Sequence, residues 1–285
     1  MLIVDKPAGI TSHNVVARCR RALGQRQVGH GGTLDPSATG VLLVGAGGAT
    51  RLLRFLSVLP KSYEGEVVLG VETATLDADG EVVATHDMAG VTLGDVRAAA
   101  ARFRGEIDQV PPMVSAVKVG GRRLHELARA GVEVERDARP VVVHRLDVEA
   151  GPQPGTVRIS VDCSSGTYVR TLAADLGAAL GGGAHLRRLR RTAVGPFTLA
   201  DARPLAEVGP DALLPPADAV RHLPRVSVDG DTAAAIAHGA VLARQAGPFE
   251  GDGPWAVLDD AGDLLAVYEA RGSDGAKPAM VLSAR

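Results

Sequence analysis

The sequence predicts an α+β protein with a mixed or antiparallel sheet, followed by a small β-rich domain. Three observations support this fold class. Segments with helical and with strand periodicity interleave, but without the regular spacing of βαβ units. A proline-rich stretch at residues 201–224 interrupts the pattern, and the composition changes beyond it. Hydrophobic residues make up 46% of the 285 residues, which is enough for a sizeable buried core.

The first half of the chain predicts two helices and two strands. The first helix is expected over residues 12–23, with Ser12 as its cap and Gly24 at its end. Its inward face is expected to hold Val15, Cys19 and Ala22. Two apolar runs then predict short strands with a helix between them, in the order 41–44, 48–57 and 66–71.

The second half predicts further helices and strands in the same way. Thr92 and Asp95 resemble a capping box that opens a helix to about Arg104. The inward positions of that helix are Val96, Ala100 and Phe103. Residues 156–163 alternate apolar and polar, which is typical of a half-buried strand, and a helix follows at about 168–180.

The proline-rich stretch is interpreted as a linker. It carries Pro204, Pro210, Pro215, Pro216 and Pro224. Beyond it, strands are expected near 254–258 and 264–269, so a second small domain is predicted at 225–285.

The composition favours a globular cytoplasmic protein. The first residues, MLIVDKPAG, lack the charged and apolar regions of a signal peptide. No apolar run reaches the ~18 residues that a membrane helix needs, so no interaction with a membrane is expected. The two cysteines, Cys19 and Cys163, lie far apart, which argues against a disulfide framework or a cysteine metal site.

The net charge of −2 hides a local asymmetry. Residues 225–285 are acidic, whereas the rest of the chain is slightly basic and carries three basic clusters. The clusters are Arg18, Arg20, Arg21 and Arg26; Lys118, Arg122, Arg123 and Arg129; and Arg187, Arg188, Arg190 and Arg191. Any one cluster is equally well a solvated face, but three together favour docking of a phosphate backbone.

One glycine-rich segment imitates a dinucleotide-binding turn. Residues 41–53 read as a strand, a turn and a helix. The fingerprint requires glycine at its first, third and sixth positions; Gly45 and Gly47 fit, but Thr50 stands at the sixth. No repeated βαβ pattern surrounds the segment, so no nicotinamide cofactor is expected, and the sequence indicates no other cofactor or metal.

The segment GHGGTLDPSATGVLLV, residues 29–44, is more informative. His30, Asp35 and Thr39 are polar side chains among Gly, Pro and Ala, in a loop that leads into an apolar strand. A residue before proline is disfavoured in the helical region, so extended backbone is expected to present the Asp35 carboxylate. Asp-Pro also opens ordinary turns, so spacing alone leaves a structural role open.

Five segments, in order and in spacing, resemble motifs of the TruB family, the bacterial tRNA pseudouridine-55 synthases. They are DKPAGITSHNVV (5–16), HGGTLDPSATG (30–40), KSYEGEVVLGVETATLDADG (61–80), QVPPMVSAVKVGGRRLHELARAG (109–131) and CSSGTYVRTLAADLGAALGGGAHLRRLRRTAVGPF (163–197). The last sixty residues match loosely, but their place and size are similar to the family's small PUA-like domain. The resemblance implies a pseudouridine synthase fold with a catalytic domain at 1–224, an RNA-gripping insertion at about 111–140, and a PUA-like domain at 225–285.

The resemblance also implies roles for individual residues. Asp35 stands at the catalytic aspartate, Tyr63 at the base-stacking position and Arg170 at the catalytic arginine. Other matched residues would contact the substrate or brace the site. His30 would fill the gap that the base vacates or stack within the loop, Leu189 would press on the ring, and Lys6 would brace the site. Lys118, Arg122 and Arg123 would bind phosphates. Each has a simpler interpretation, because Tyr63 also fits a strand core, Arg170 a surface helix and Leu189 a helix face.

Pseudouridylation explains why these residue types are needed. The reaction breaks the C1′–N1 bond of uridine, rotates the uracil and joins C1′ to C5, without a cofactor. A carboxylate can act at the electron-poor C1′, as in glycosidases, and Asp35 would either attack C1′ or deprotonate the sugar. Arg170 would keep this carboxylate ionised. The base must be flipped out, and Tyr63 would stack on it with its hydroxyl near C5.

Two alternatives share part of this pattern. Related archaeal and eukaryotic enzymes act within guide-RNA particles, but the short chain lacks basic terminal extensions, which favours a stand-alone enzyme without an obligatory protein partner. A tRNA-binding folding helper would not need an intact Asp35, Tyr63 and Arg170. The predicted partner is the T arm of tRNA, recognised mainly by its shape.

Overall fold

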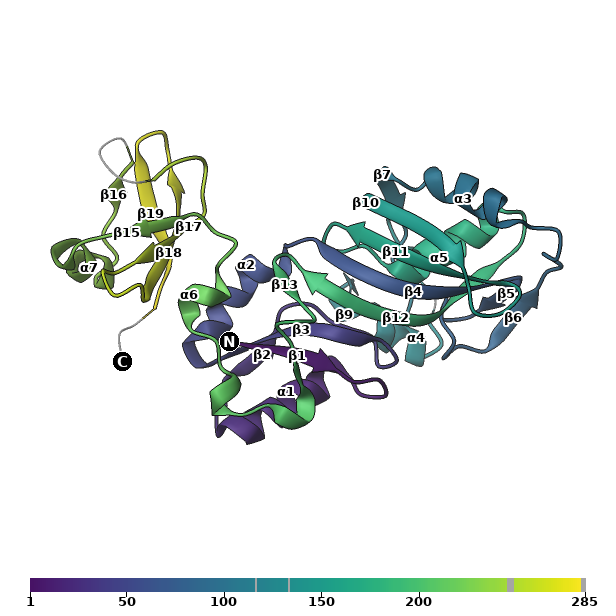
Figure 1. The fold of residues 1–285 in the computed structure, drawn as a ribbon, viewed down its shortest axis with the longest axis horizontal. Coiled ribbons are helices and arrows are strands. Elements are labelled where there is room, and N and C mark those ends of the chain that lie inside the picture. The colour runs from purple at the N-terminus through teal and green to yellow at the C-terminus, as the bar shows by residue number, and fades with distance from the viewer. Residues whose placement is uncertain (116, 133, 245–248, 283–285) are drawn as a thin grey trace. The chain divides into compact units, whose positions relative to one another are not determined.

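The computed structural model describes residues 1–115, 117–132, 134–244 and 249–282. The chain forms two compact units. The first unit comprises Met1–Pro36, Val41–Ser57 and Gly195–Arg285, and the second comprises Ser37–Gly40 and Val58–Val194 (Figure 1). Helices accompany parallel and antiparallel strand pairs, so the predicted α+β class with a mixed sheet is confirmed.

The first unit begins with a strand, a helix and a hairpin. Its elements up to residue 57 are β1 (Leu2–Lys6), α1 (Ser12–Leu23), β2 (Val28–His30), β3 (Thr39–Ala46), the 3₁₀ helix η1 (Gly47–Leu52) and α2 (Leu53–Ser57). β1 lies beside β3, and β2 pairs antiparallel with β3. The apolar runs of these elements pack together in one core, formed by Leu2, Val4, Val15, Val16, Cys19, Val28, Leu42 and Val44.

The predicted helix α1 has the expected bounds but a different cap. The side chain of Thr11, not that of Ser12, accepts a hydrogen bond from the Asn14 N–H at 3.0 Å. Gly24 ends the helix with φ of 58°, a left-handed conformation that glycine adopts without strain. Ala22 is exposed instead of inward, because the larger Val16 shares the buried stripe with Val15 and Cys19.

The proline-rich stretch is not the irregular linker that the sequence predicts. It contains β14 (Arg203–Pro204), η2 (Leu205–Glu207), η3 (Pro210–Ala212) and α6 (Pro216–Ala219), after β13 (Phe197–Thr198). β14 pairs parallel with β1, and the Leu214 N–H donates to the Met1 carbonyl at 2.7 Å. Prolines fit here because they fix φ at values that short 3₁₀ turns and helix starts use.

A small five-stranded sheet forms the rest of the first unit. Its elements are β15 (Arg225–Ser227), α7 (Gly230–Ala237), β16 (Leu242–Ala243), β17 (Trp255–Leu258), β18 (Leu264–Arg271) and β19 (Gly275–Val281), with strand order β15-β17-β18-β19-β16. Buried aromatic rings fill it: Phe249 and Trp255 meet edge to face at 5.2 Å. The Tyr268 hydroxyl donates to the Ala240 carbonyl at 2.7 Å. The β-rich domain and its two predicted strands are therefore confirmed.

The second unit is built on five antiparallel strands in the order β12-β4-β11-β10-β7. Its elements are β4 (Lys61–Leu69), β5 (Val71–Thr73), β6 (Val82–Thr85), α3 (Leu93–Ala101), β7 (Gly105–Gln109), β8 (Lys118–Val119), β9 (Arg122–Arg123), α4 (Leu124–Arg129), β10 (Arg139–Ala150), β11 (Thr156–Cys163), α5 (Val169–Ala179) and β12 (Ala184–Val194). The strand predicted at 156–163 and the capping box of Thr92 and Asp95 are confirmed. α3 ends three residues earlier than predicted, and Phe103 is half-buried in the turn that follows.

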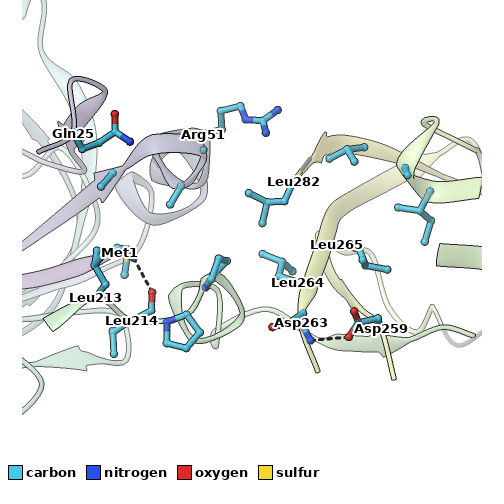
Figure 2. A pocket seen from close by; sticks show the side chains of 18 of the residues that line it. Met1, Gln25, Arg51, Leu213, Leu214, Asp259, Asp263, Leu264, Leu265 and Leu282 are labelled. Atoms are coloured by element: carbon cyan, nitrogen blue, oxygen red, sulfur yellow. Dashed lines mark hydrogen bonds between the residues drawn. The ribbon is translucent and has the colours of Figure 1, made fainter. Parts of the chain in front are cut away.

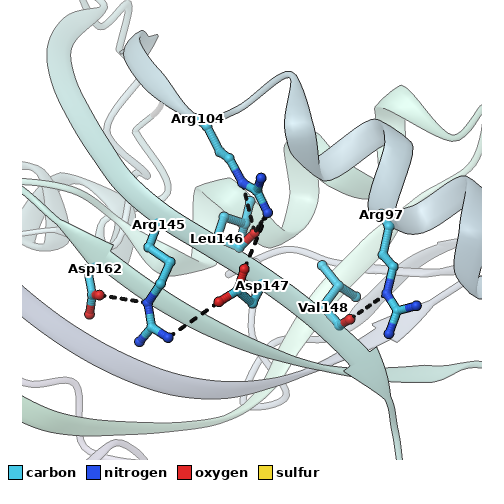
Figure 3. A network of polar contacts seen from close by, with 7 residues as sticks. All are labelled: Arg97, Arg104, Arg145, Leu146, Asp147, Val148 and Asp162. Carbon is cyan, nitrogen blue, oxygen red and sulfur yellow. Dashed lines mark hydrogen bonds and ion pairs between the residues drawn. The ribbon is translucent and has the colours of Figure 1, made fainter.

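Two arginine side chains donate hydrogen bonds to backbone carbonyls along one edge of β10. β7 pairs with β10 along Arg139–Val143, the first part of the longer strand. Farther along, Arg97 Nε donates to the Val148 carbonyl at 2.9 Å, and Arg104 donates to the Leu146 carbonyl from Nε at 3.2 Å and from Nη2 at 2.8 Å (Figure 3). Guanidinium groups therefore satisfy carbonyls of β10 beyond the part of the strand that pairs with β7.

Candidate functional site

Asp35 lies half-buried in the loop between β2 and β3, as the sequence predicts. The residue before it, Leu34, is held by the hydroxyl of Ser12, which is 1% exposed. Ser12 Oγ donates to the Leu34 carbonyl at 3.0 Å and accepts from the Leu34 N–H at 2.9 Å. One buried hydroxyl therefore fixes both backbone groups next to the candidate carboxylate.

The residue after Asp35 is held as firmly. The Pro36 carbonyl accepts from the Gly9 N–H at 2.9 Å and from the Lys6 ammonium at 3.0 Å. Lys6 is fully buried and also donates to the Pro7 carbonyl at 2.9 Å. Both flanks of Asp35 are therefore tied to the stretch that runs from the end of β1 to the start of α1. The role of Lys6 as a brace of the site stays a prediction.

His30 ends β2, five residues before Asp35. Its half-buried ring packs edge to face against His13, with centroids 5.3 Å apart. This contact orients the ring within the first unit.

The second unit contains Tyr63, Arg170 and Leu189. Tyr63 lies on β4, 9% exposed, with Val161 and Arg191 opposite it on the neighbouring strands. Lys61 is two residues earlier, so it shares the face of β4 with Tyr63. Lys61 is 6% exposed, and burial together with the charge of Arg191 lowers the pKa of its ammonium to about 8. Buried positive charge therefore surrounds the strand position of Tyr63.

Arg170 is buried in the first turn of α5, so the interpretation as a surface helix residue is wrong. Its guanidinium forms an ion pair with Asp77 Oδ2 at 3.2 Å. It also donates to the Thr75 carbonyl at 3.0 Å and to the Val114 carbonyl at 2.9 Å. A planar guanidinium held by several acceptors has a fixed orientation, which suits it to hold a second carboxylate or a substrate.

Asp77 is a site residue that the sequence does not predict. This carboxylate sits in a tight loop after β5, where Oδ1 accepts from the Thr75 hydroxyl and from the Asp79 N–H. Leu76 adopts φ of 62°, so the loop requires a strained backbone. Local sequence signals a turn here, but nothing in it links position 77 to Arg170.

Leu189 lies on β12, so its interpretation as part of a helix face is wrong. Its side chain is half-buried, and Gly65 of β4 stands opposite. The arginines around it alternate along the strand: Arg187 contacts Glu66, Arg188 is exposed, and Arg191 is 1% exposed. This cluster is therefore not a single phosphate-binding patch.

The other two basic clusters both present arginine side chains to solvent. Four arginines of the first cluster are exposed at α1 and its C-terminal end: Arg18, Arg20, Arg21 and Arg26. In the second cluster Arg122 is exposed on β9, one strand of the β8–β9 ribbon inside the predicted insertion. The side chains of Lys118 and Arg123 lie outside the described part of the structure.

A cavity of about 1060 Å³ in the first unit is separate from these residues (Figure 2). Its walls are mostly aliphatic, including Leu213, Leu214, Leu264 and Leu282. Among the described residues that line it, none is a predicted site residue.

Across the described ranges, none of the helices combines the length and the hydropathy that a membrane-spanning segment requires.

Two family models match the chain in succession. The TruB family pseudouridylate synthase (N terminal domain) matches residues 20–169, and the tRNA pseudouridylate synthase B C-terminal domain matches residues 170–214. Together, the two matched ranges include Asp35 and Tyr63 in the first, and Arg170 and Leu189 in the second.

Curated relatives and solved structures agree with this assignment. The tRNA pseudouridine synthase B of Symbiobacterium thermophilum is 56% identical over 243 residues, which cover 84% of this chain and 81% of the relative. That of Rhodococcus jostii is 49% identical over 279 residues, covering 95% and 90%.

The structure titled "Crystal Structure of a Cbf5-Nop10-Gar1 Complex" is similar with a TM-score of 0.75 and 29% identity, covering 99% of this chain and 83% of that one. "Structure of H/ACA RNP bound to a substrate RNA containing 2'-deoxyuridine" is similar with a TM-score of 0.74 and 27% identity, covering 100% and 84%. Fold, motifs and sequence identity therefore converge: this chain belongs to the TruB family of pseudouridylate synthases.

Proposed function

We propose that this chain isomerises uridine 55 in the T loop of tRNA to pseudouridine, with Asp35 as the catalytic carboxylate. The observation that carries the proposal is the clamp on Asp35. Buried Ser12 and Lys6 hold the residues on either side of it, although an ordinary surface turn needs no such support. Fixed placement of a reacting group is a large part of catalysis.

The chemistry follows from the electron-poor sugar carbon. The C1′–N1 bond breaks, the uracil rotates, and C1′ bonds to C5, whose proton then leaves to solvent while N1 gains one. Asp35 acts either by attack at C1′ or by deprotonation of the sugar. We assign Arg170 the role of keeping Asp35 ionised, since a guanidinium favours the charged form of a carboxylate.

Recognition of the RNA is assigned to residues other than Asp35 and Arg170. The target base has to leave its stack, and Tyr63 would hold it by stacking, with the hydroxyl near C5. Leu189 would press on the ring and His30 would occupy the space that the base vacates. Lys118, Arg122 and Arg123 would bind phosphates of the T arm, and the PUA-like domain would add a weak contact.

The relatives favour a stand-alone enzyme over one that works within a guide-RNA particle. Identity is 56% and 49% to the two tRNA enzymes, against 29% and 27% to the proteins of the two solved complexes. We therefore propose tRNA as the substrate, no obligatory protein partner, and action in the cytoplasm. A helper that only folds tRNA would not need the ordered Arg170–Asp77 pair.

Tritium release tests this proposal, because the reaction exchanges the hydrogen at C5. Wild-type protein should release about one tritium per tRNA transcript labelled at C5 of its uridines, from the T-loop uridine alone. Asp35→Asn is nearly isosteric but lacks the charge and the nucleophile, so it should bind tRNA normally and release none. Release by Asp35→Asn at the wild-type rate would refute the role of Asp35, and no release by wild type would refute the function.

A further inference from the structure

Gln109 makes an unusual pair of hydrogen bonds. It is the last residue of β7, and its side chain is 2% exposed. Its amide donates from Nε2 to the Tyr168 carbonyl at 3.1 Å and accepts at Oε1 from the Tyr168 N–H at 2.8 Å. A primary amide carries a donor and an acceptor side by side, so it binds both backbone groups of one residue as a neighbouring strand would.

The residue that Gln109 holds is where α5 begins. Tyr168 is the N-cap of α5, in extended conformation with φ −100° and ψ 106°, and its own side chain forms no capping bond. Arg170 follows two residues later, in the first turn. Because the helix start has no side-chain cap of its own, the amide of Gln109 supplies the constraint that fixes where the first turn begins.

The segment after Gln109 reaches the Arg170 side chain as well. Val110 leads into Pro111 and Pro112, and consecutive proline rings restrict the backbone to extended conformations. Two residues beyond them, the Val114 carbonyl accepts from Arg170 Nη2 at 2.9 Å. One short, stiff segment therefore contacts both the backbone at the start of α5 and the guanidinium that α5 carries.

We propose that Gln109 is a positioning residue for the pseudouridylation reaction, which sets the start of α5 and thereby the direction of the Arg170 guanidinium. This inference rests on the proposed function. Gln109 acts through Arg170 and not on the substrate, so it influences the rate of the chemical step more than the affinity for tRNA. A merely structural amide would instead lower the stability of the fold without altering the rate of the folded enzyme.

Gln109→Leu tests the proposal, because leucine has a similar volume but forms neither hydrogen bond. Single-turnover tritium release at saturating tRNA should slow by at least about tenfold, since small misplacements of catalytic groups have large kinetic effects. The dissociation constant for tRNA, measured by filter binding, should stay within about twofold. Val148→Ala is the matched control, because it removes buried volume from β10 and lowers the melting temperature while leaving these contacts intact.

Gln109→Glu adds a readout that a stability effect does not produce. A protonated carboxyl donates and accepts as the amide does, and burial raises the pKa of a carboxyl group. The rate of this variant relative to wild type should therefore rise as the pH falls.

Three outcomes would overturn the proposal: a wild-type rate for Gln109→Leu, equal slowing by Val148→Ala, or a flat relative pH profile for Gln109→Glu. If wild type itself releases no tritium, the proposed function fails, and the role of Gln109 in it fails too.

Discussion

At the scale of single residues, Ser12 shows how much depends on where a hydroxyl points. The sequence predicts a helix cap, but Thr11 performs that task and Ser12 holds Leu34 instead. The two hydroxyls are adjacent, and local sequence does not distinguish them. The difference arises from a loop that lies 22 residues farther along the chain.

Removing each hydroxyl should separate stability from catalysis. Ser12→Ala leaves both backbone groups of Leu34 without this partner, which costs about 1–3 kcal/mol of stability and loosens the Asp35 loop. We expect single-turnover tritium release to slow by about tenfold. Thr11→Ala is the matched control; it should cost about 1 kcal/mol in urea unfolding and leave the rate unchanged. Equal rates for the two variants would contradict the clamp.

Lys61 should make stability depend on pH in a predictable direction. The pKa of Lys61 is about 8 in the folded protein against an ordinary value of 10.5, so the unfolded chain binds more protons between these values. The free energy of unfolding of wild type should therefore rise with pH, relative to Lys61→Met, by roughly 3 kcal/mol from pH 8 to 10.5. Urea unfolding across this range measures the difference. A curve for Lys61→Met that runs parallel to wild type would contradict the assignment.

At the scale of elements, the periodicity of the sequence predicts the long segments well. The strand at 156–163 and the capping box of α3 follow from alternation and from one local motif. The secondary structure of the 187–191 arginines is harder to predict. They lie on a strand in which Arg191 is buried, but their sequence alone resembles that of a charged helix. Asp77 and Gln109 escape prediction for the same reason: their partners are distant in sequence.

The β8–β9 ribbon is where we expect the insertion to meet RNA. Replacing Arg122 and Arg123 by Gln removes two positive charges that would displace counterions from phosphates. tRNA binding should weaken, and the slope of log affinity against log salt should flatten by roughly two. Arg102→Gln, an exposed position at the end of α3, should leave the slope unchanged. A filter-binding titration with an unchanged slope for the double variant would exclude the ribbon from the interface.

At the scale of the whole molecule, the first unit combines the beginning and the end of the chain. β14 pairs with β1 across about two hundred residues, a contact that no local pattern reveals, so the sequence alone predicts a linker at residues 201–224. Two strands of the small sheet that follows, β17 and β18, are predictable because each is a short, mostly apolar run. The exact boundary between catalytic and PUA-like domains stays a prediction.

Truncation after residue 224 tests what the small sheet contributes. The matched motifs lie upstream, and the acidic composition of 225–285 disfavours strong binding to phosphates. We expect tRNA affinity to fall by less than about tenfold, or 1.4 kcal/mol, while single-turnover rates at saturating tRNA persist. Circular dichroism establishes that the shortened chain is folded. A folded but inactive truncation would mean that the small sheet completes the active site.

The two arginines on β10 also bear on how the protein behaves at high concentration. An open row of strand carbonyls is a template on which a second chain can add a strand, the first step of edge-to-edge aggregation. Arg97 and Arg104 occupy those carbonyls with charged groups that another backbone cannot easily displace. This part of the β10 edge is thereby protected against the addition of a strand from another chain, and the protection requires two side chains instead of an additional strand.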